Sequence, residues 1–121
     1  MYLRFVVGSD TDDHRHLTGI ITEARSLRDE ELLHDFEDTW LEKQFNWFND
    51  HVPVPPYAKS DWPSGCVAWF KNNEAATEAI KRMWEFVNLL KENGKNVRVL
   101  KSKKPGFILY EDDVQVVVSE F

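Results

Sequence analysis

The stretch that decides the fold is KPGFILYEDDVQVVV, residues 104–118. Two apolar runs, residues 107–110 and 114–118, flank Asp112-Asp113, and aspartates tolerate turn geometry. Pro105-Gly106, before the first run, fits the two central positions of a type II turn. The stretch therefore predicts two β-strands joined by a tight turn and entered through another turn.

Three more strands are predicted upstream. Residues 97–100 form a short strand which, with the two that follow, predicts a three-stranded antiparallel meander at the C-terminal end. The alternation of residues 2–7 has the period of two that indicates a strand. The run CVAWF, residues 66–70, is apolar and is bounded by Gly65 and Asn72-Asn73. It also predicts a strand, although a helical turn would fit its periodicity.

Three helices are predicted between these strands. The first covers residues 17–27, with Thr18 as a cap, and the second runs from a cap at Asp29 to Asp50, before Val52-Pro53. The third covers residues 74–93 and ends at Asn93-Gly94. Asn72 or Asn73 caps the third helix. The core stripe of the second is Leu33, Phe36, Trp40 and Trp47, broadened by Leu41, Phe45 and Phe48; that of the third is Ala76, Ile80, Met83, Val87 and Leu90, with Ala79, Trp84 and Phe86 beside it.

The order β-α-α-β-α-β-β-β indicates one α+β domain over residues 1–121, with a mostly antiparallel sheet and helices packed on one face. No apolar run approaches the roughly 20 residues that span a bilayer. The apolar start of the chain lacks the basic flank and cleavage site of a signal peptide. With a single cysteine, Cys66, no internal disulfide can form. We therefore expect a cytoplasmic protein.

Three blocks of the sequence carry a resemblance. They are YLRFVV at residues 2–7, WFK at 69–71 and PGFILYEDDVQVV at 105–117. Together they resemble a family of short bacterial proteins that has no assigned activity. The resemblance implies a bacterial origin and carries over no catalytic residue. The last hairpin is also similar to the closing hairpin of ADP-ribosyltransferases, but Pro105-Gly106 stands where those enzymes place a catalytic glutamate.

The net charge of −6 is unevenly distributed. Residues 1–50 hold five Lys and Arg against twelve Asp and Glu, and the rest of the chain holds ten against nine. An acidic protein repels phosphate backbones, so nucleic acid is a disfavoured partner. The balance fits solubility and a basic protein partner equally well.

One loop concentrates groups that ligate metals, namely Asp10, Asp12, Asp13, His14 and His16. The spacing fits neither a calcium loop nor a helical zinc site. We therefore expect a solvated loop, with no metal and no other cofactor.

Two further clusters have ordinary explanations. Cys66 with His51 as its base would make a nucleophile, but nothing in the sequence brings the two together, and a cysteine in an apolar strand is usually a core residue. No catalytic residue is predicted, and an enzyme is the less favoured class. The basic segment would suit single-stranded nucleic acid, but a solvated hairpin that offsets nearby Glu111, Asp112 and Asp113 is favoured; its residues are Lys95, Arg98, Lys101, Lys103 and Lys104.

The segment Val52–Gly65 holds four prolines and carries Tyr57 and Trp62 outside any regular element. Aromatic side chains on a stiff loop make good interface anchors, although the simpler expectation is that both rings fold back to cover the core. We therefore expect an intracellular protein-binding or regulatory protein, similar in type to immunity proteins and antitoxins. The alternative is a small enzyme or a nucleotide- or nucleic-acid-binding domain. Its site would lie beside the C-terminal meander, at Trp69, Tyr110 and Gln115.

Overall fold

A computed structural model describes residues 1–8, 18–57, 61–62 and 65–119 of the chain. Its strands are β1 (Tyr2–Val7), β2 (Thr18–Gly19), β3 (Val67–Lys71), β4 (Val97–Ser102), β5 (Phe107–Glu111) and β6 (Gln115–Ser119). Its helices are α1 (Ile20–Asp29), α2 (Asp35–His51), the short 3₁₀ helix η3 (Glu74–Ala76) and α3 (Thr77–Glu92). Apart from the two-residue β2 and η3, this is the predicted order, and the α+β class is confirmed. No helix in these ranges is long and apolar enough to cross a membrane.

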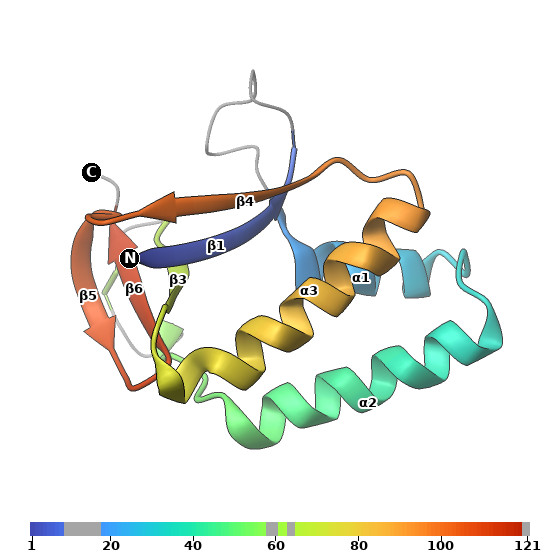
Figure 1. Ribbon diagram of the computed structural model, residues 1–121, viewed down its shortest axis with the longest axis horizontal. Helices are drawn as coiled ribbons and strands as arrows, with labels where there is room; N and C mark the ends of the chain where they lie inside the picture. Colours follow the sequence, from blue (N-terminus) through green and yellow to red (C-terminus); the bar gives the residue numbers. More distant parts are fainter. Residues whose placement is uncertain (9–17, 58–60, 63–64, 120–121) are drawn as a thin grey trace.

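Strand β1 is the centre of an antiparallel sheet (Figure 1). Along one edge β4 pairs with all of it, from Tyr2 opposite Ser102 to Val7 opposite Val97. The other edge is shared, because β3 pairs with its first two residues and β2 with its last two. From β3 the sheet continues to β6 and then to β5. In the part of the chain described, β2 and β3 leave the middle of that edge, at Arg4 and Phe5, uncovered by either strand.

The predicted three-stranded meander is wrong. β5 and β6 do form a hairpin, with a register shift between Ile108 and Tyr110, but β4 pairs with β1 instead of β5. Buried backbone groups need hydrogen-bond partners, and β4 supplies them along one whole edge of β1. The pairing also places Val97 opposite Val7 and Val99 opposite Phe5, so that apolar side chains share one face.

The predicted type II turn at Pro105-Gly106 is also wrong. Gly106 has a φ of +154°, whereas the third residue of that turn lies near about +80°. The glycine is required by close packing, since a Cβ here would lie 2.5 Å from the backbone oxygen of Ser119.

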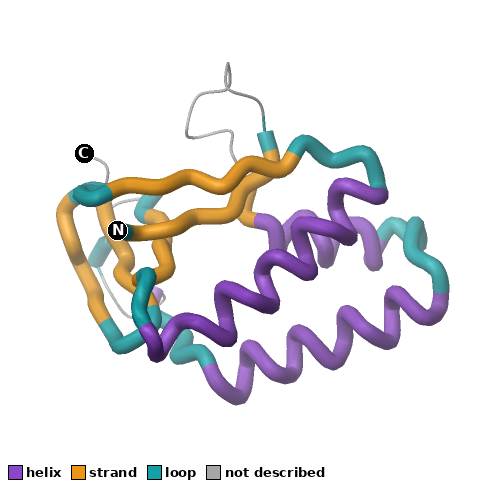
Figure 2. The backbone as a smooth tube through the Cα atoms, viewed as in Figure 1, coloured by secondary structure: helices purple, strands orange, loops and turns teal. Residues whose placement is uncertain are grey.

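All three helices lie against one face of the sheet, as predicted (Figure 2). The main core joins them to Leu3 and Phe5 of β1 and to Phe70 of β3. Because side chains alternate along a strand, Trp69 points to the other face. There it forms a smaller cluster with Val116 and Val118, against which Tyr2, Val67 and Leu100 pack. Strand β6 is buried along its whole length between the two clusters.

The boundary between the first two helices differs from the prediction. Asp29 does not cap the second helix but is the last residue of α1. The chain then turns through Glu31, which has a positive φ of 57°, and α2 begins at Asp35. At its start the carboxylate of Glu37 accepts a hydrogen bond of 3.0 Å from the backbone N–H of His34.

The buried face of α2 is also rotated relative to the predicted stripe. The buried residues are Leu41, Gln44, Phe45 and Phe48. Phe36, predicted to be core, is 74% exposed, whereas Leu33, Trp40 and Trp47 are partly buried at the margin of the core.

Helix α3 follows its prediction closely. The side chain of Asn73 accepts a hydrogen bond of 2.9 Å from the N–H of Ala76, and Gly94 ends the helix with a φ of +78°. Met83, Val87 and Leu90 are buried as predicted, but Ile80 is only partly so. Trp84, also predicted to be core, is 47% exposed and packs edge-on against Phe5.

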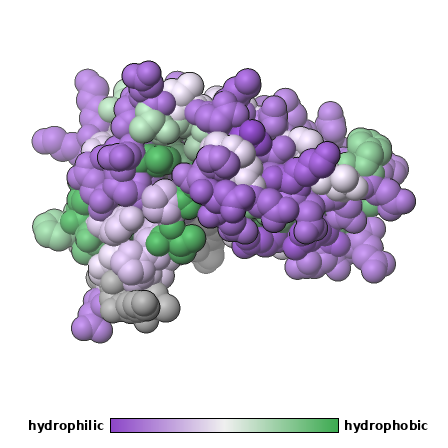
Figure 3. Space-filling view, turned by 90° about the horizontal axis from the view of Figure 1, so that it is seen from below, coloured by the Kyte–Doolittle hydropathy of each residue, from purple (hydrophilic) through white to green (hydrophobic). Residues whose placement is uncertain are grey.

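The surface of one long side is mostly hydrophilic, with apolar patches at both ends (Figure 3). Large apolar side chains that remain exposed cluster in three sequence regions: 32–36, 54–57 and 107–108. Scattered exposed hydrophobic residues are normal in proteins, but neighbouring ones mark candidate contact surfaces.

Candidate functional site

An aromatic cluster joins the proline-rich segment to strand β5. The rings of Tyr57 and Trp62 meet edge to face, with centroids 5.6 Å apart. Trp62 in turn lies 6.1 Å from the ring of Tyr110. Pro55 is buried and anchors the segment, while Tyr57 stays 44% exposed. Tyr57, Trp62 and Tyr110 are called the aromatic cluster below.

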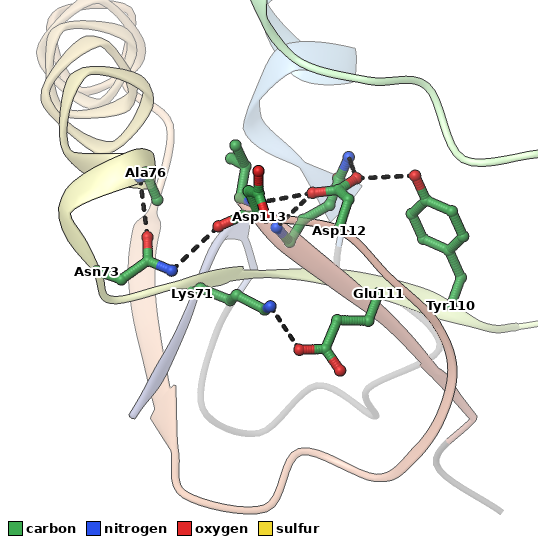
Figure 4. Close-up of polar contacts among 9 residues, drawn as sticks. Lys71, Asn73, Ala76, Tyr110, Glu111, Asp112 and Asp113 are labelled. Atoms are coloured by element: carbon green, nitrogen blue, oxygen red, sulfur yellow. Dashed lines mark hydrogen bonds and ion pairs between the residues drawn. The ribbon is translucent and has the colours of Figure 1, made fainter.

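Polar contacts hold Tyr110 of the cluster in place (Figure 4). The hydroxyl of Tyr110 donates to Oδ2 of Asp112 at 2.9 Å, and the same oxygen accepts from Nε2 of Gln115 at 3.1 Å. Nε2 of Gln115 also donates to the backbone oxygen of Pro53 at 2.6 Å. A buried amide costs free energy unless it is hydrogen-bonded, so Gln115 ties the proline-rich segment to the hairpin.

The turn between β5 and β6 is built around the same carboxylate. Oδ1 of Asp112 accepts from the backbone N–H groups of Val114, at 2.8 Å, and Gln115, at 3.0 Å. The neighbouring Asp113 accepts through its backbone oxygen from Nδ2 of Asn73, at 3.0 Å. The start of α3, the hairpin turn and the aromatic cluster are therefore held by one connected set of hydrogen bonds.

These contacts shift the acidity of both partners. Burial by itself would raise the pKa of Asp112, but the hydrogen bonds that it accepts from Val114, Gln115 and Tyr110 outweigh burial and lower it. The pKa of Tyr110 is raised, first by the hydrogen bond to Asp112 and then by burial. At neutral pH Asp112 is thus a carboxylate and Tyr110 a hydroxyl donor.

An open cavity of about 540 Å³ lies beside the cluster. It occupies the gap on the edge of β1 between β2 and β3, and the start of α1, the end of α2 and residues 52–57 close its sides. Most of its lining is apolar. Its polar lining residues are Arg4, Thr22, Arg25, Asn49, Tyr57, Cys66 and Gln115, and among the described residues no carboxylate lines it.

Tyr57 connects the cavity to the aromatic cluster. Its pKa is raised chiefly by burial and secondarily by the negative charge that a Cys66 thiolate would carry nearby. His51 is not part of this site: its ring stacks on Trp47 and, in the tautomer with Nδ1 protonated, donates to the backbone oxygen of Trp47 at 2.9 Å. The structure thus places Cys66 at the cavity without His51 as a base.

The two predicted sites turn out to be largely one. Trp62, which packs on Tyr57, meets Tyr110 of the ligand-binding alternative. Gln115, also of that alternative, is hydrogen-bonded to Pro53 of the same proline-rich segment. Trp69 stands apart, 5% exposed within the smaller cluster, and in the part of the chain described its Nε1 has no hydrogen-bond partner. Sequence reasoning missed Asp112 as the organising residue, although its place as the first residue of the predicted Asp112-Asp113 turn was a usable signal.

The remaining predicted clusters contribute little here. The aspartate-histidine loop, residues 10–16, lies outside the described residues, and within these no group of three or more His, Cys, Asp or Glu side chains could hold a metal ion. In the basic segment, Lys95 lies 3.9 Å from Glu23. Glu111, expected to offset that segment, pairs instead with Lys71 at 2.5 Å.

Comparison with known proteins returned no matching family model, no matching curated protein and no matching solved structure. The resemblance to short bacterial proteins therefore stays a prediction. No residue role can be transferred from another protein, and the geometry alone supports the proposals that follow.

Proposed function

We propose that this is a small intracellular binding protein of regulatory type, comparable in kind to immunity proteins and antitoxins. It acts by holding another protein against the aromatic cluster. The observation that carries the proposal is an exposed Tyr57 fixed on Trp62 and Tyr110 beside an open apolar cavity.

The arrangement meets the physical needs of an interface. Prolines restrict the free segment, and the bond from Gln115 to Pro53 anchors it, so little entropy is lost when a partner binds. Tyrosine and tryptophan bury large areas with few rotatable bonds, and they are enriched among residues that dominate binding energy. The neighbouring cavity can receive an apolar side chain from the partner.

Site-specific photocrosslinking tests this proposal. A benzophenone amino acid at position 57 should crosslink to one host protein, and Trp62→Ala should abolish that crosslink. The matched control carries the photoprobe at Phe107, which is 71% exposed on β5 and outside the aromatic cluster. Position 57 yielding no product, or the same products as position 107, would contradict the proposal.

The cavity favours a second candidate, a small enzyme or nucleotide-binding domain. Its volume lies within the roughly 300–1,000 Å³ that is typical of ligand sites. Arg25, whose guanidinium lies 4.9 Å from the ring of Phe45, puts positive charge on a wall whose described lining residues include no carboxylate. An anionic ligand with an apolar body, such as a nucleotide, fits that chemistry.

Thermal denaturation with a panel of nucleoside mono-, di- and triphosphates separates the candidates. A rise in melting temperature that Ala68→Phe removes, by filling the cavity, would support the ligand-binding candidate. Crosslinking from position 57 with no shift for any nucleotide would leave the protein-binding function alone.

A further inference from the structure

A second apolar surface lies at the other end of the molecule from the aromatic cluster, where α2 begins and α3 ends (Figure 1). It is a groove of about 320 Å³ between these two helices. Phe36 and Trp40 from α2 and Leu89 from α3 form its apolar part. Its remaining lining residues are Glu37, Glu85, Asn88 and Glu92, and this whole set is called the acidic groove below.

Phe36 contributes little to the packing of the described core. It lies in the first turn of α2 and is 74% exposed, and its one ring contact is a stack on His34, with centroids 5.7 Å apart. Leu32, just before the helix, is also exposed. Trp40 and Leu89 behind Phe36 do belong to the fold, because Trp40 packs on Phe86 and Leu89 is buried. Trp40 and Leu89 thus form the base of the groove, and the exposed ring of Phe36 forms its rim.

The charge around this rim has one sign. Glu37, Glu85 and Glu92 line the groove, and no Lys or Arg is among its described lining residues. Glu85 and Glu92 are seven positions apart, which is close to two turns of α3, so they share one side of the helix. Neither forms an ion pair with any described residue. The carboxylates are therefore available to cations from outside.

We propose that the acidic groove binds a basic amphipathic segment of another protein. One or two apolar side chains of that segment cover Phe36 and reach Trp40, while its lysines or arginines pair with Glu85 and Glu92. Two helices that form a groove with an aromatic rim are a common receptor for a third, amphipathic helix. The same carboxylates repel nucleic acid and anionic membranes.

Selection from a displayed library of random peptides tests the proposal, with the intact protein as bait. Enriched peptides should carry Lys or Arg beside apolar residues at helical spacing of three or four. Binding of the best peptide, measured by calorimetry, should weaken about tenfold or more in Phe36→Ala and in the pair Glu85→Lys and Glu92→Lys. Glu37 is left intact because it caps α2 through His34.

Matched controls separate specific from general attraction. Phe107→Ala removes another exposed aromatic ring, and the pair Glu30→Lys and Asp50→Lys makes the same change in net charge at two helix ends that favour cations. Both controls should keep wild-type affinity, and circular dichroism should show every variant folded. Enrichment of acidic or uncharged peptides, no enrichment, or equal weakening by the control pair would overturn the proposal.

The same peptide also shows which of the two proposed surfaces binds it. Tyr57→Ala alters the aromatic cluster and should not change the affinity of a peptide held at the acidic groove. A peptide that is lost with Tyr57→Ala and retained with Phe36→Ala would refute the groove while supporting the aromatic cluster.

Discussion

Asp112 shows how much one side chain can organise. Its carboxylate accepts from two backbone N–H groups of the β5–β6 turn, from the hydroxyl of Tyr110 and from the amide of Gln115. A neutral side chain of the same shape could keep the Oδ1 bonds. At the Oδ2 position an asparagine would present N–H groups to two donors.

We predict that Asp112→Asn lowers stability at neutral pH by about 1–2 kcal/mol, since hydrogen bonds to a charged group are lost. The pKa of Asp112 is lowered in the folded state. Its contribution is therefore complete above the unfolded-state value of about 3.9 and is lost as the pH falls through the folded-state value. Urea denaturation across the acid range should show the difference between the two proteins shrinking below about pH 4. A difference that stays constant with pH would contradict the assigned role of the charge.

Gly106 allows a second prediction at this scale. In Gly106→Ala the new Cβ would lie 2.5 Å from the backbone oxygen of Ser119, so strand β6 has to move. Gly94→Ala is the matched control: its φ is also positive, but no atom lies within 4 Å of the added Cβ. We expect Gly94→Ala to cost about 1 kcal/mol, the cost of the left-handed backbone, and Gly106→Ala to cost clearly more. Thermal denaturation of both variants measures the two losses of stability, and equal losses would contradict the proposed close packing.

The residues of the site could be predicted from the sequence, but the fact that they lie together could not. The position of Tyr57 and Trp62 among prolines indicated a site, and so did the position of Tyr110 and Gln115 on either side of a turn. The bond from Gln115 to Pro53 spans 62 positions of sequence. No local pattern encodes such a contact, so the sequence presented one site as two alternatives.

Among the elements, α3 organises the core through its aromatic contacts. Phe86 is fully buried, and its ring centroid lies 5.4 Å from Trp40, 6.1 Å from Phe45 and 6.0 Å from Phe48. These rings fill the space between α3 and α2. Trp84, two positions earlier, meets the ring of Phe5 edge-on and remains about half exposed.

We predict that Phe86→Ala lowers the free energy of unfolding by about 3–5 kcal/mol, the usual cost of deleting a buried aromatic ring. Trp84→Ala removes a larger ring from the same helix and should cost clearly less, because much of that ring already faces water. Guanidinium denaturation measures both. Equal losses, or a larger loss for Trp84→Ala, would mean that α3 packs a different face against the core.

Element order could be predicted because strands and helices leave local periodicity, and α3 was predicted almost to its ends by Asn73 and Gly94. The start of α2 could not be predicted in the same way. Leu33 and Phe36 extend the apolar spacing upstream of Trp40, but the chain turns at Glu31 and starts the helix anew. The partner of β4 was equally hidden, since β1 and β5 both offer an apolar, alternating strand.

At the scale of the whole molecule, β1 joins strands from distant parts of the sequence into one sheet. It pairs with β2, β3 and β4, and among the described strands no other has three partners. Leu3 and Phe5 belong to the main core, and Tyr2 packs against the smaller cluster on the opposite face. Removing β1 would expose both clusters and leave β4 with no partner strand in the described structure.

We predict that a chain starting at Gly8 does not fold. A chain starting at Tyr2, which lacks only the exposed Met1, should keep its structure. Dispersion of amide signals in NMR spectra distinguishes the two states. A folded protein without residues 1–7 would show that the sheet does not depend on β1.

The pairing of β1 with β4 has a consequence for biosynthesis. Ninety positions separate Val7 from Val97, so a ribosome releases β1 long before its main partner exists. At about 5–20 residues per second the delay is on the order of 5–20 seconds. Throughout that time an apolar strand has only the two residues of β2, and later β3, to pair with. The nascent chain is thus a natural client for chaperones, and rapid synthesis of the segment up to residue 102 favours the yield of native protein.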